Sequence, residues 1–515
     1  MRKAIILLPL LILSVKMALT QEIVIPSEQV TDKIRGGLLG QNLGVLNGLP
    51  YEFTFIEQPG DVSGYVPSLP EGARTDDDTD FEWVYIYQMQ KTGQIRIPYP
   101  EVAQLWRERI NRNIWSANRY ARHLMDIGIE PPLTGYASIN PWSSFNLSGQ
   151  FLSETFALLA PGMPQTASKI GLHYTQVAIG QESAQATQFF CSMIAAAFIE
   201  DDIREIIQWG IAALDEKSII RDIARDVGDW QRQHPDDWPK TWELIHEKYK
   251  QDTWIESYNG YGLNAAAVVA ALLYGNGDFA KTIEYAFNFG WDADCNAATA
   301  GTILGAVKGY RWMMSQGWQI VDRYANTTRE HMLMDETMTS FADRLMDLFE
   351  TVNEHNGGTR FRAGGILSYR IPTERPEPVA RLHDNEAQYQ TLVDDLREEV
   401  IENISSTDRR LQARGAYLAI CLDMAAEVSR QDAKSWEKSV RALSGYWKIV
   451  NNVFYGSDFP ALNNLASEFV KAGIGKPTRK LEDHEIYEDM TIWKEPGTWP
   501  PAHVGRITNV NEDDL

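Results

Sequence analysis

The chain has 515 residues, of which 44% are hydrophobic and 23% are charged. This composition is typical of a soluble globular protein, and the length predicts one large domain with smaller additions. A formal net charge of −22 makes nucleic acid and anionic membrane surfaces poor partners and favours cation binding. The three cysteines provide no disulfide framework, so we expect a large core to hold the fold together.

The first 20 residues have the pattern of a secretory signal peptide. Arg2 and Lys3 precede an apolar run over residues 4–15, and small residues lead up to Thr20. The alternative interpretation is a membrane anchor. The run has about 12 residues, however, whereas a membrane span needs about 20. We therefore predict a secreted or periplasmic protein that is cleaved near Thr20 and has no membrane span.

Helical patterns dominate the rest of the chain and predict an all-α fold. Residues 21–368 are expected to form one compact domain of many helices. Small or apolar helices are expected at 187–199, 265–273 and 297–307. Alternating patterns are nearly absent, so the short runs 23–25 and 366–371 would be single strands at most.

The remainder of the chain is predicted to add a second helical region. Residues 369–378 (YRIPTERPEP) contain three prolines and are predicted to be a linker. Residues 379–515 are predicted to form additional helices followed by an extended tail rich in proline and tryptophan. Within them, apolar residues from Leu411 to Val428 recur at steps of three and four, which predicts one face of a helix.

Glycines recur at every fourth position soon after the predicted signal peptide. The series comprises Gly36, Gly40, Gly44 and Gly48. On a helix these glycines share one face, where the missing side chains let another backbone approach closely. Close helix packing is therefore the expected role of the glycines. Glu52, which follows directly, is a candidate catalytic carboxylate.

Two turns rich in carboxylates lead directly into apolar helices. The turns contain Asp76, Asp77, Asp78 and Asp80 in the first, and Asp292 and Asp294 in the second. One carboxylate would cap a helix N-terminus, but four in five residues repel one another unless a cation lies among them. Oxygen ligands on loops suit Mg²⁺, Mn²⁺ or Ca²⁺. The turns therefore predict a metal site, and a solvated acidic surface is the alternative.

Three motifs occur in a fixed order along the chain. They read Gly48-Leu49-Pro50-Tyr51-Glu52, Asp76-Asp77-Asp78-Thr79 and Asp292-Ala293-Asp294-Cys295. With them the chain resembles the ADP-ribosylglycohydrolase family, which includes the dinitrogenase reductase-activating glycohydrolases, over about residues 33–350. The resemblance implies an all-α fold, two Mg²⁺ or Mn²⁺ ions between the aspartate turns, and hydrolysis at the anomeric carbon of ADP-ribose.

The resemblance also assigns roles to residues of this chain. It implies Asp77, Asp78, Asp292 and Asp294 as metal ligands. Asp76 stands where the family has a ligating threonine, and Glu52 stands at the position of the glutamate that assists the reaction. Two positions depart from the family: Val45 replaces an aspartate, and Cys295 replaces the usual ligand threonine.

The resulting hypothesis is an exported, metal-dependent glycosidase acting on an ADP-ribosyl conjugate or a related furanoside. In it the metal pair binds the sugar diol and activates water, Asp78 orients that water, and Glu52 serves as general acid. One alternative is a furanosidase acting on an extracellular glycan. Another, motivated by Val45 and Cys295, is a non-catalytic binding protein on the same scaffold. A terpene synthase motif, Asp76-Asp77-x-x-Asp80, is disfavoured because a second metal-binding motif is missing.

Overall fold

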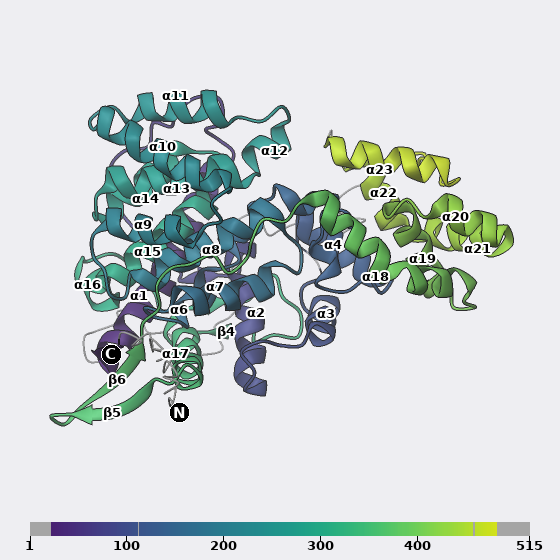
Figure 1. Cartoon of the computed structure of the whole chain (residues 1–515). Helices are drawn as coiled ribbons and strands as arrows, with labels where there is room; N and C mark the ends of the chain where they lie inside the picture. Colours follow the sequence, from purple (N-terminus) through teal and green to yellow (C-terminus); the bar gives the residue numbers. More distant parts are fainter. Residues whose placement is uncertain (1–21, 112, 457–458, 482–515) are drawn as a thin grey trace, which may run out of the picture.

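The computed structural model describes residues 22–111, 113–456 and 459–481. These residues are predominantly helical, as the sequence predicts, and Figure 1 shows a main body of packed helices with the C-terminal helices to one side. The predicted signal peptide and the end of the predicted tail lie outside this part of the chain. Within it, no helix is both long and apolar enough to cross a membrane.

The main body contains helices of 4 to 22 residues. Its helices are α1 (Ser27–Gly48), α2 (Asp77–Thr92), α3 (Tyr99–Glu108), α4 (Ser116–Asp126), α5 (Ser148–Phe151), α6 (Glu154–Leu158), α7 (Pro164–Thr175), α8 (Gln181–Ala196), α9 (Ile203–Ala213), α10 (Ile219–Gln233), α11 (Trp238–Tyr249), α12 (Trp254–Tyr258), α13 (Tyr261–Gly275), α14 (Phe279–Phe289), α15 (Ala293–Lys308), α16 (Tyr310–Ser315) and α17 (Met338–His355). Three 3₁₀ helices are η1 (Leu49–Tyr51), η2 (Leu133–Gly135) and η3 (Pro141–Ser144). The three helices expected from small or apolar residues lie largely in α8, α13 and α15.

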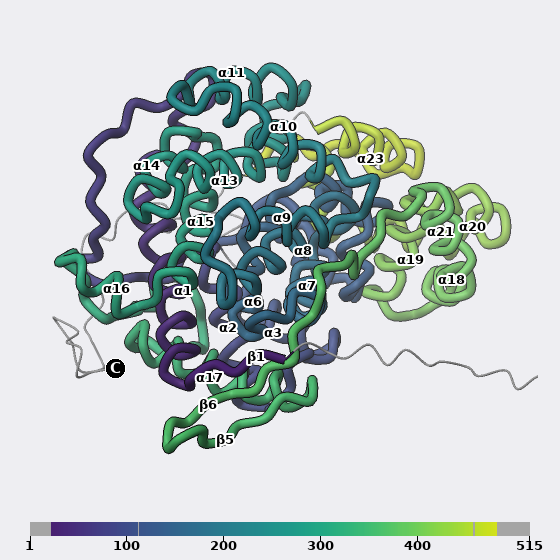
Figure 2. Tube along the Cα trace, turned by 60° about the vertical axis from the view of Figure 1, so that its left-hand side comes forward, coloured from purple at the N-terminus to yellow at the C-terminus, as the bar shows by residue number. Residues whose placement is uncertain are grey.

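Helices α1 and α15 pack directly against each other in the main body (Figure 2). A Cβ atom added at Gly40 would lie 2.0 Å from the carbonyl oxygen of Gly301, and one at Gly44 would lie 2.2 Å from that of Ala297. No real side chain fits at such distances, so both helices need small residues along this face. The predicted close packing of the glycine face is confirmed.

Two small sheets border the helices. In the first, β6 (Ile366–Pro372) lies between β1 (Glu22–Pro26) and β5 (Thr359–Ala363), and both pairings are antiparallel. In the second, β3 (Tyr324–Ala325) lies between β2 (Ala73–Arg74), which is parallel to it, and β4 (Asp335–Glu336), which is antiparallel. The two runs predicted as single strands are therefore β1 and β6, and they pair with each other.

The predicted linker begins inside a strand rather than after it. Residues 369–372 belong to β6, where Tyr369 is buried and pairs with Ile25 of β1. The strand predicted at 366–371 therefore overlaps the start of the predicted linker, and its partner β1 lies more than 300 residues away in the sequence. The segment after β6 then crosses the front of α7 and α8 toward the C-terminal helices (Figure 1).

The C-terminal helices contact the main body near α4 and η3. They are α18 (Asn385–Ser405), α19 (Arg409–Cys421), α20 (Ala425–Gln431), α21 (Ala433–Ser444), α22 (Trp447–Tyr455) and α23 (Pro460–Lys471). The Tyr417 hydroxyl donates to the Ile139 carbonyl at 2.7 Å, and the Trp142 indole donates to Asn452 at 3.0 Å. The continuous helix expected over residues 411–428 is wrong, because Asp423 adopts a left-handed conformation (φ 52°) that separates α19 from α20.

Candidate metal centre and active site

The first aspartate turn lies between strand β2 of the second sheet and the start of α2. The Thr75 amide donates to the Ala325 carbonyl at 2.8 Å and continues the pairing of β2 with β3. Asp76 is the N-cap residue of α2, and Asp77 and Asp78 occupy its first turn. Because the N-terminal end of a helix carries partial positive charge, it tolerates these carboxylates better than a loop would.

The second aspartate turn is held by a strained backbone. Gly290 (φ 74°) and Trp291 (φ 54°) both have positive φ, which is uncommon for a bulky residue such as tryptophan. The Trp291 amide donates to the Phe55 carbonyl at 3.0 Å, and the Phe53 amide donates to the Trp291 carbonyl at 2.8 Å. This pairing brings the segment that starts at Glu52 alongside Asp292, the N-cap residue of α15.

The glycine face of α1 sets the position of Asp294. A Cβ atom at Gly48 would lie 2.5 Å from the Asp294 Cα atom, so the last turn of α1 rests on the first turn of α15. Glu52 follows four residues later, after η1. Close packing of two helices thus fixes the Glu52 segment relative to the second aspartate turn.

Residues from all three motifs meet in one cluster. Ligand atoms of Asp78, Asp294 and Cys295 lie within 4.8 Å of one another, as do those of Glu52, Asp292 and Asp294. Asp294 belongs to both groups and joins them. Of the predicted site residues, Asp76 and Asp77 lie outside these two groups.

The two remaining aspartates of the first turn are nevertheless close to the cluster. Asp77 lines the same pocket as Glu52 and Asp292. Asp76 is buried, and one of its oxygens lies 3.8 Å from an Arg74 nitrogen. Burial raises the pKa of Asp76 to about 6, although the Arg74 charge opposes that rise.

Buried oxygens without hydrogen-bond donors indicate that the cluster fits a cation. Within the described part of the chain, buried atoms that have no hydrogen-bond partner include both carboxylate oxygens of Asp76, Oδ2 of Asp78, Oδ1 of Asp292 and Oδ1 of Asp294. Burial, together with repulsion between neighbouring carboxylates, raises the pKa of Asp78 and Asp294 well above the usual range. An unpaired buried charge is very unfavourable, so a bound divalent ion would offset a large cost.

The cysteine in the second motif takes part in the cluster. The Cys295 thiol donates to Oδ1 of Asp78 at 3.0 Å, and so links the two aspartate turns directly. Sulfur is a soft ligand that suits Mg²⁺ poorly and Mn²⁺ better. Val45, the other departure from the family pattern, is fully buried within α1.

Asp80, the fourth carboxylate of the first turn, has a structural partner instead. Its oxygens accept hydrogen bonds from Arg329 Nη2 at 2.9 Å and from the Thr328 hydroxyl at 2.5 Å. Arg329 Nε lies 2.7 Å from Asp80, and both side chains are completely buried. Asp80 therefore stabilises the fold next to the cluster and does not extend it.

An amide network behind the second turn was not predicted from the sequence. Asn264 Oδ1 accepts from the Asp292 amide at 3.1 Å and from Asn296 Nδ2 at 2.9 Å. Gln150 Nε2 donates to Asn296 Oδ1 at 3.0 Å. The sequence signal for this network was Asn264, the one asparagine in the apolar sequence of α13. A polar side chain in such a helix is expected to have specific hydrogen-bond partners, because buried polar groups are nearly always paired.

The cluster opens into a pocket with an aromatic wall. The pocket has a volume of about 320 Å³, and its aromatic lining comprises Phe53, Trp115, Phe151 and Trp254. Phe53 and Trp254 pack with their ring centroids 5.2 Å apart, and Trp254 is 49% exposed. An acidic floor and an aromatic wall suit a polar ligand that also presents a flat ring or sugar face.

Comparison with known proteins supports the reading of these motifs. The family model described as ADP-ribosylglycohydrolase matches residues 26–355. The matched range runs from the end of β1 to the end of α17 and so contains the whole acidic cluster. A comparison with curated proteins finds no match.

Proposed function

We propose a function from one premise: the chain belongs to the ADP-ribosylglycohydrolase family, and its family activity is that of a glycosyl hydrolase. The proposed reaction is metal-dependent hydrolysis of the anomeric bond of an ADP-ribosyl or related furanosyl substrate. One observation supports the metal dependence. Asp78, Asp292 and Asp294 each have a buried carboxylate oxygen that accepts no hydrogen bond.

Two divalent ions, Mg²⁺ or Mn²⁺, would be held by the two overlapping groups. Asp78 and Asp294 would hold one ion, with the Cys295 sulfur next to it, and Asp292 and Asp294 would hold the other, with Glu52 beside it. When bound, such ions stabilise charge on substrate oxygens and lower the pKa of water. The thiol of Cys295 makes Mn²⁺ the better fit of the two metals.

The protein's own residues position the sugar and the leaving group. Glu52 lines the pocket, where its carboxyl group can hold a proton for the departing oxygen. Asp78, whose Oδ1 accepts a hydrogen bond from the Cys295 thiol, would orient the attacking water. The aromatic wall at Phe53 and Trp254 would exclude water and support a ring of the substrate.

A second candidate substrate, a furanoside of an extracellular glycan, is favoured by the charge of the pocket. Among the described residues that line it, none is lysine or arginine, whereas Glu52, Asp77, Asp292 and Asp294 are acidic. A diphosphate would find no basic side chain in this lining, while a neutral furanoside would need none. The signal-peptide pattern of residues 1–20 supports export and therefore agrees with this substrate.

A hydrolysis panel tests the proposal. The purified chain would be incubated with ADP-ribosyl-arginine, O-linked ADP-ribose and aryl ribo-, arabino- and galactofuranosides, each with Mn²⁺ or with a chelator. Release from an ADP-ribosyl substrate that the chelator abolishes would support the family reaction, and release from a furanoside alone would support the second candidate. Asp292→Asn should abolish turnover while the fold remains intact. No turnover on any substrate would favour a binding protein.

A further inference from the structure

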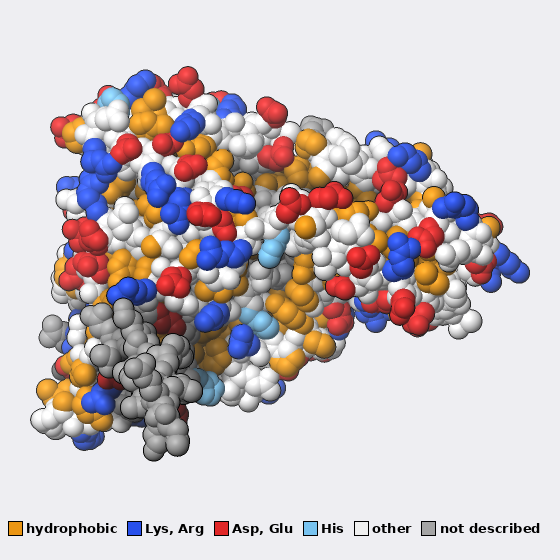
Figure 3. All heavy atoms as spheres, viewed as in Figure 1, with side chains coloured by type: hydrophobic (Ala, Val, Ile, Leu, Met, Phe, Trp, Pro, Cys, Tyr) orange, Lys and Arg blue, Asp and Glu red, His pale blue; other side chains and the backbone are white. Residues whose placement is uncertain are grey.

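A second hollow lies where the crossing segment after β6 passes over α7. It has a volume of about 480 Å³ and lies between α7, the start of α8, the loop around Tyr136 and residues 379–383. In Figure 1 this is the place where the green segment runs across the front of the main body toward α18. Figure 3, in the same view, shows blue and pale blue side chains on the front face along this crossing.

The lining of this hollow is basic. Its lining includes three positively charged side chains and two histidines: Arg96, Lys169, Arg381, His173 and His383. None of the described residues that line it is aspartate or glutamate. In a chain with a formal net charge of −22, a hollow with only basic charge creates a local field opposite to that of the whole protein.

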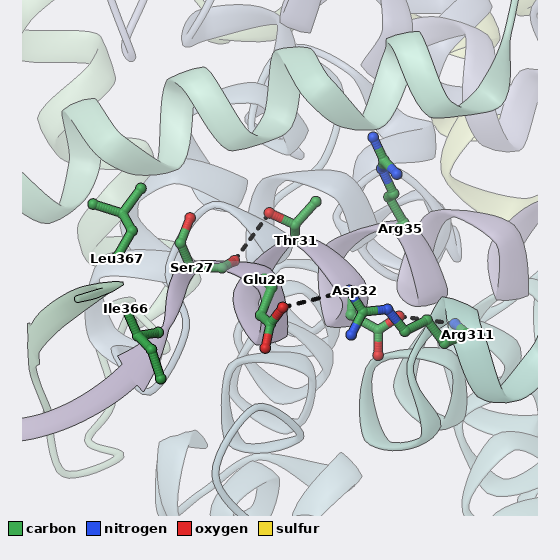
Figure 4. Close-up of a pocket in the computed structure, with 8 residues that line it drawn as sticks. All are labelled: Ser27, Glu28, Thr31, Asp32, Arg35, Arg311, Ile366 and Leu367. Carbon is green, nitrogen blue, oxygen red and sulfur yellow. Dashed lines mark hydrogen bonds and ion pairs between the residues drawn. The ribbon is translucent and has the colours of Figure 1, made fainter. Parts of the chain in front are cut away.

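Another pocket shows how basic side chains are usually balanced in this protein. The pocket between the start of α1 and α16 contains Arg311, whose guanidinium lies 3.7 Å from Glu28 (Figure 4). The Arg311 amide also donates to Asp32 at 2.8 Å. There Arg311 is paired with acidic side chains of α1.

Two basic side chains of the second hollow lack such partners. Arg96 and Lys169 make no ion pair or side-chain hydrogen bond with any described residue, whereas Arg381 forms an ion pair with Asp215 at 3.9 Å. The charges of Arg96 and Lys169 are thus available to an anion, and they come from two separate segments that border one space.

His173 and the N-terminus of α8 also border the hollow. His173 stacks on Tyr99 with ring centroids 4.6 Å apart, and its Nε2 atom lies 2.7 Å from the Ile97 carbonyl oxygen. Burial, with a contribution from the Arg96 charge, lowers the pKa of His173. The N-terminus of α8, which has no side-chain cap, opens onto the same space at Gly180.

We propose that this hollow binds a phosphate-class oxyanion, either free or as part of a small phosphorylated molecule, in a site separate from the acidic pocket and independent of divalent metal. Lys169 and Arg96 supply the charge, and the uncapped end of α8 supplies backbone donors. The site does not rest on the proposed hydrolase function, because neither the acidic cluster nor a metal takes part in it.

Calorimetric titration tests this site on the full chain with chelator present and ionic strength held constant. Inorganic phosphate should bind with a stoichiometry of one, and Lys169→Gln or Arg96→Gln should weaken binding by roughly tenfold or more. Arg225→Gln is the matched control, because Arg225 is exposed on α10, far along the chain from this hollow, and loses the same charge. Thermal unfolding would verify that each variant is folded.

Further titrations identify the source of the phosphate group. Binding of ADP-ribose that is stronger than that of phosphate and equally sensitive to Lys169→Gln would identify a phosphorylated molecule as the ligand, whereas stronger binding of phosphate would identify the free ion. The proposal is overturned if none of phosphate, sulfate and ADP-ribose binds at millimolar concentration. It is also overturned if Arg225→Gln weakens binding as much as Lys169→Gln does, since the effect would then be one of net charge.

Discussion

Replacing Gly44 with alanine tests how α1 and α15 hold the acidic cluster together. The new Cβ atom would lie 2.2 Å from the Ala297 oxygen, 2.3 Å from its carbonyl carbon and 2.4 Å from the Ala298 nitrogen. All three are backbone atoms, so no side chain can move aside. Restoring a normal contact requires the helices to separate by about 1 Å.

That separation has consequences for both stability and the site. Overpacking of this kind costs about 1–3 kcal/mol, so the free energy of unfolding should fall by that amount. Asp294 rests on Gly48 at the same interface, so it would shift relative to Asp78, which α2 holds independently. A displacement of about 1 Å at a reacting centre reduces the rate by roughly 100-fold.

The assay compares Gly44→Ala with Gly228→Ala. Gly228 lies within α10, where an added Cβ atom would meet only an Arg232 nitrogen at 3.7 Å, an ordinary contact. The control should gain up to about 1 kcal/mol from helix propensity and keep its activity and Mn²⁺ affinity. If Gly44→Ala has the same Tm, Mn²⁺ affinity and hydrolysis rate as the native chain, the helix contact does not hold the cluster and the reasoning is refuted.

Three further outcomes are expected. Asp80→Asn leaves the buried Arg329 without its carboxylate and should lower the free energy of unfolding by about 3–5 kcal/mol in denaturant titrations; an unchanged midpoint would contradict the pairing. Burial raises the pKa of Glu82 to about 8, well above the usual 4.5 of a glutamate, so the folded chain keeps a proton that the unfolded chain releases. Native stability should therefore fall between pH 5 and 8 by up to about 1.4 kcal/mol per pH unit. Glu82→Gln should lose that slope in thermal unfolding scans, and parallel curves for the two proteins would show that Glu82 is ionised. Trp254→Ala should raise KM with little change in kcat, because it removes only the ring support at the pocket mouth, and a loss confined to kcat would disagree with that role.

Local patterns made part of this structure predictable. The glycine spacing of four residues describes one helix face, and the dense carboxylates describe two helix starts, so each could be recognised within a short window of sequence. The structure shows why they belong together: Gly48 rests on Asp294, and the pairing of Phe53 with Trp291 places Glu52 beside the second turn.

Features that depend on distant pairing could not be predicted in the same way. The role of Asp80 could not be deduced from its neighbours in the first turn, because its partner Arg329 is 249 residues away. The aromatic wall combines residues that are distant in the sequence, such as Trp115, just before α4, and Trp254, at the start of α12. Tyr369 lies where the predicted strand 366–371 overlaps the predicted linker, and its pairing with Ile25 of β1 places it in the strand.

Mn²⁺ binding by the chelator-treated chain tests the central claim most directly. Titration followed by the electron paramagnetic resonance signal of free Mn²⁺ should show uptake of about two ions. Asp294→Asn should remove both, because Asp294 belongs to both ligand groups, whereas Asp236→Asn, an exposed carboxylate elsewhere, should bind as the native chain does. No uptake by the native chain, or uptake that Asp294→Asn leaves unchanged, would contradict the assignment of the acidic cluster as a metal centre.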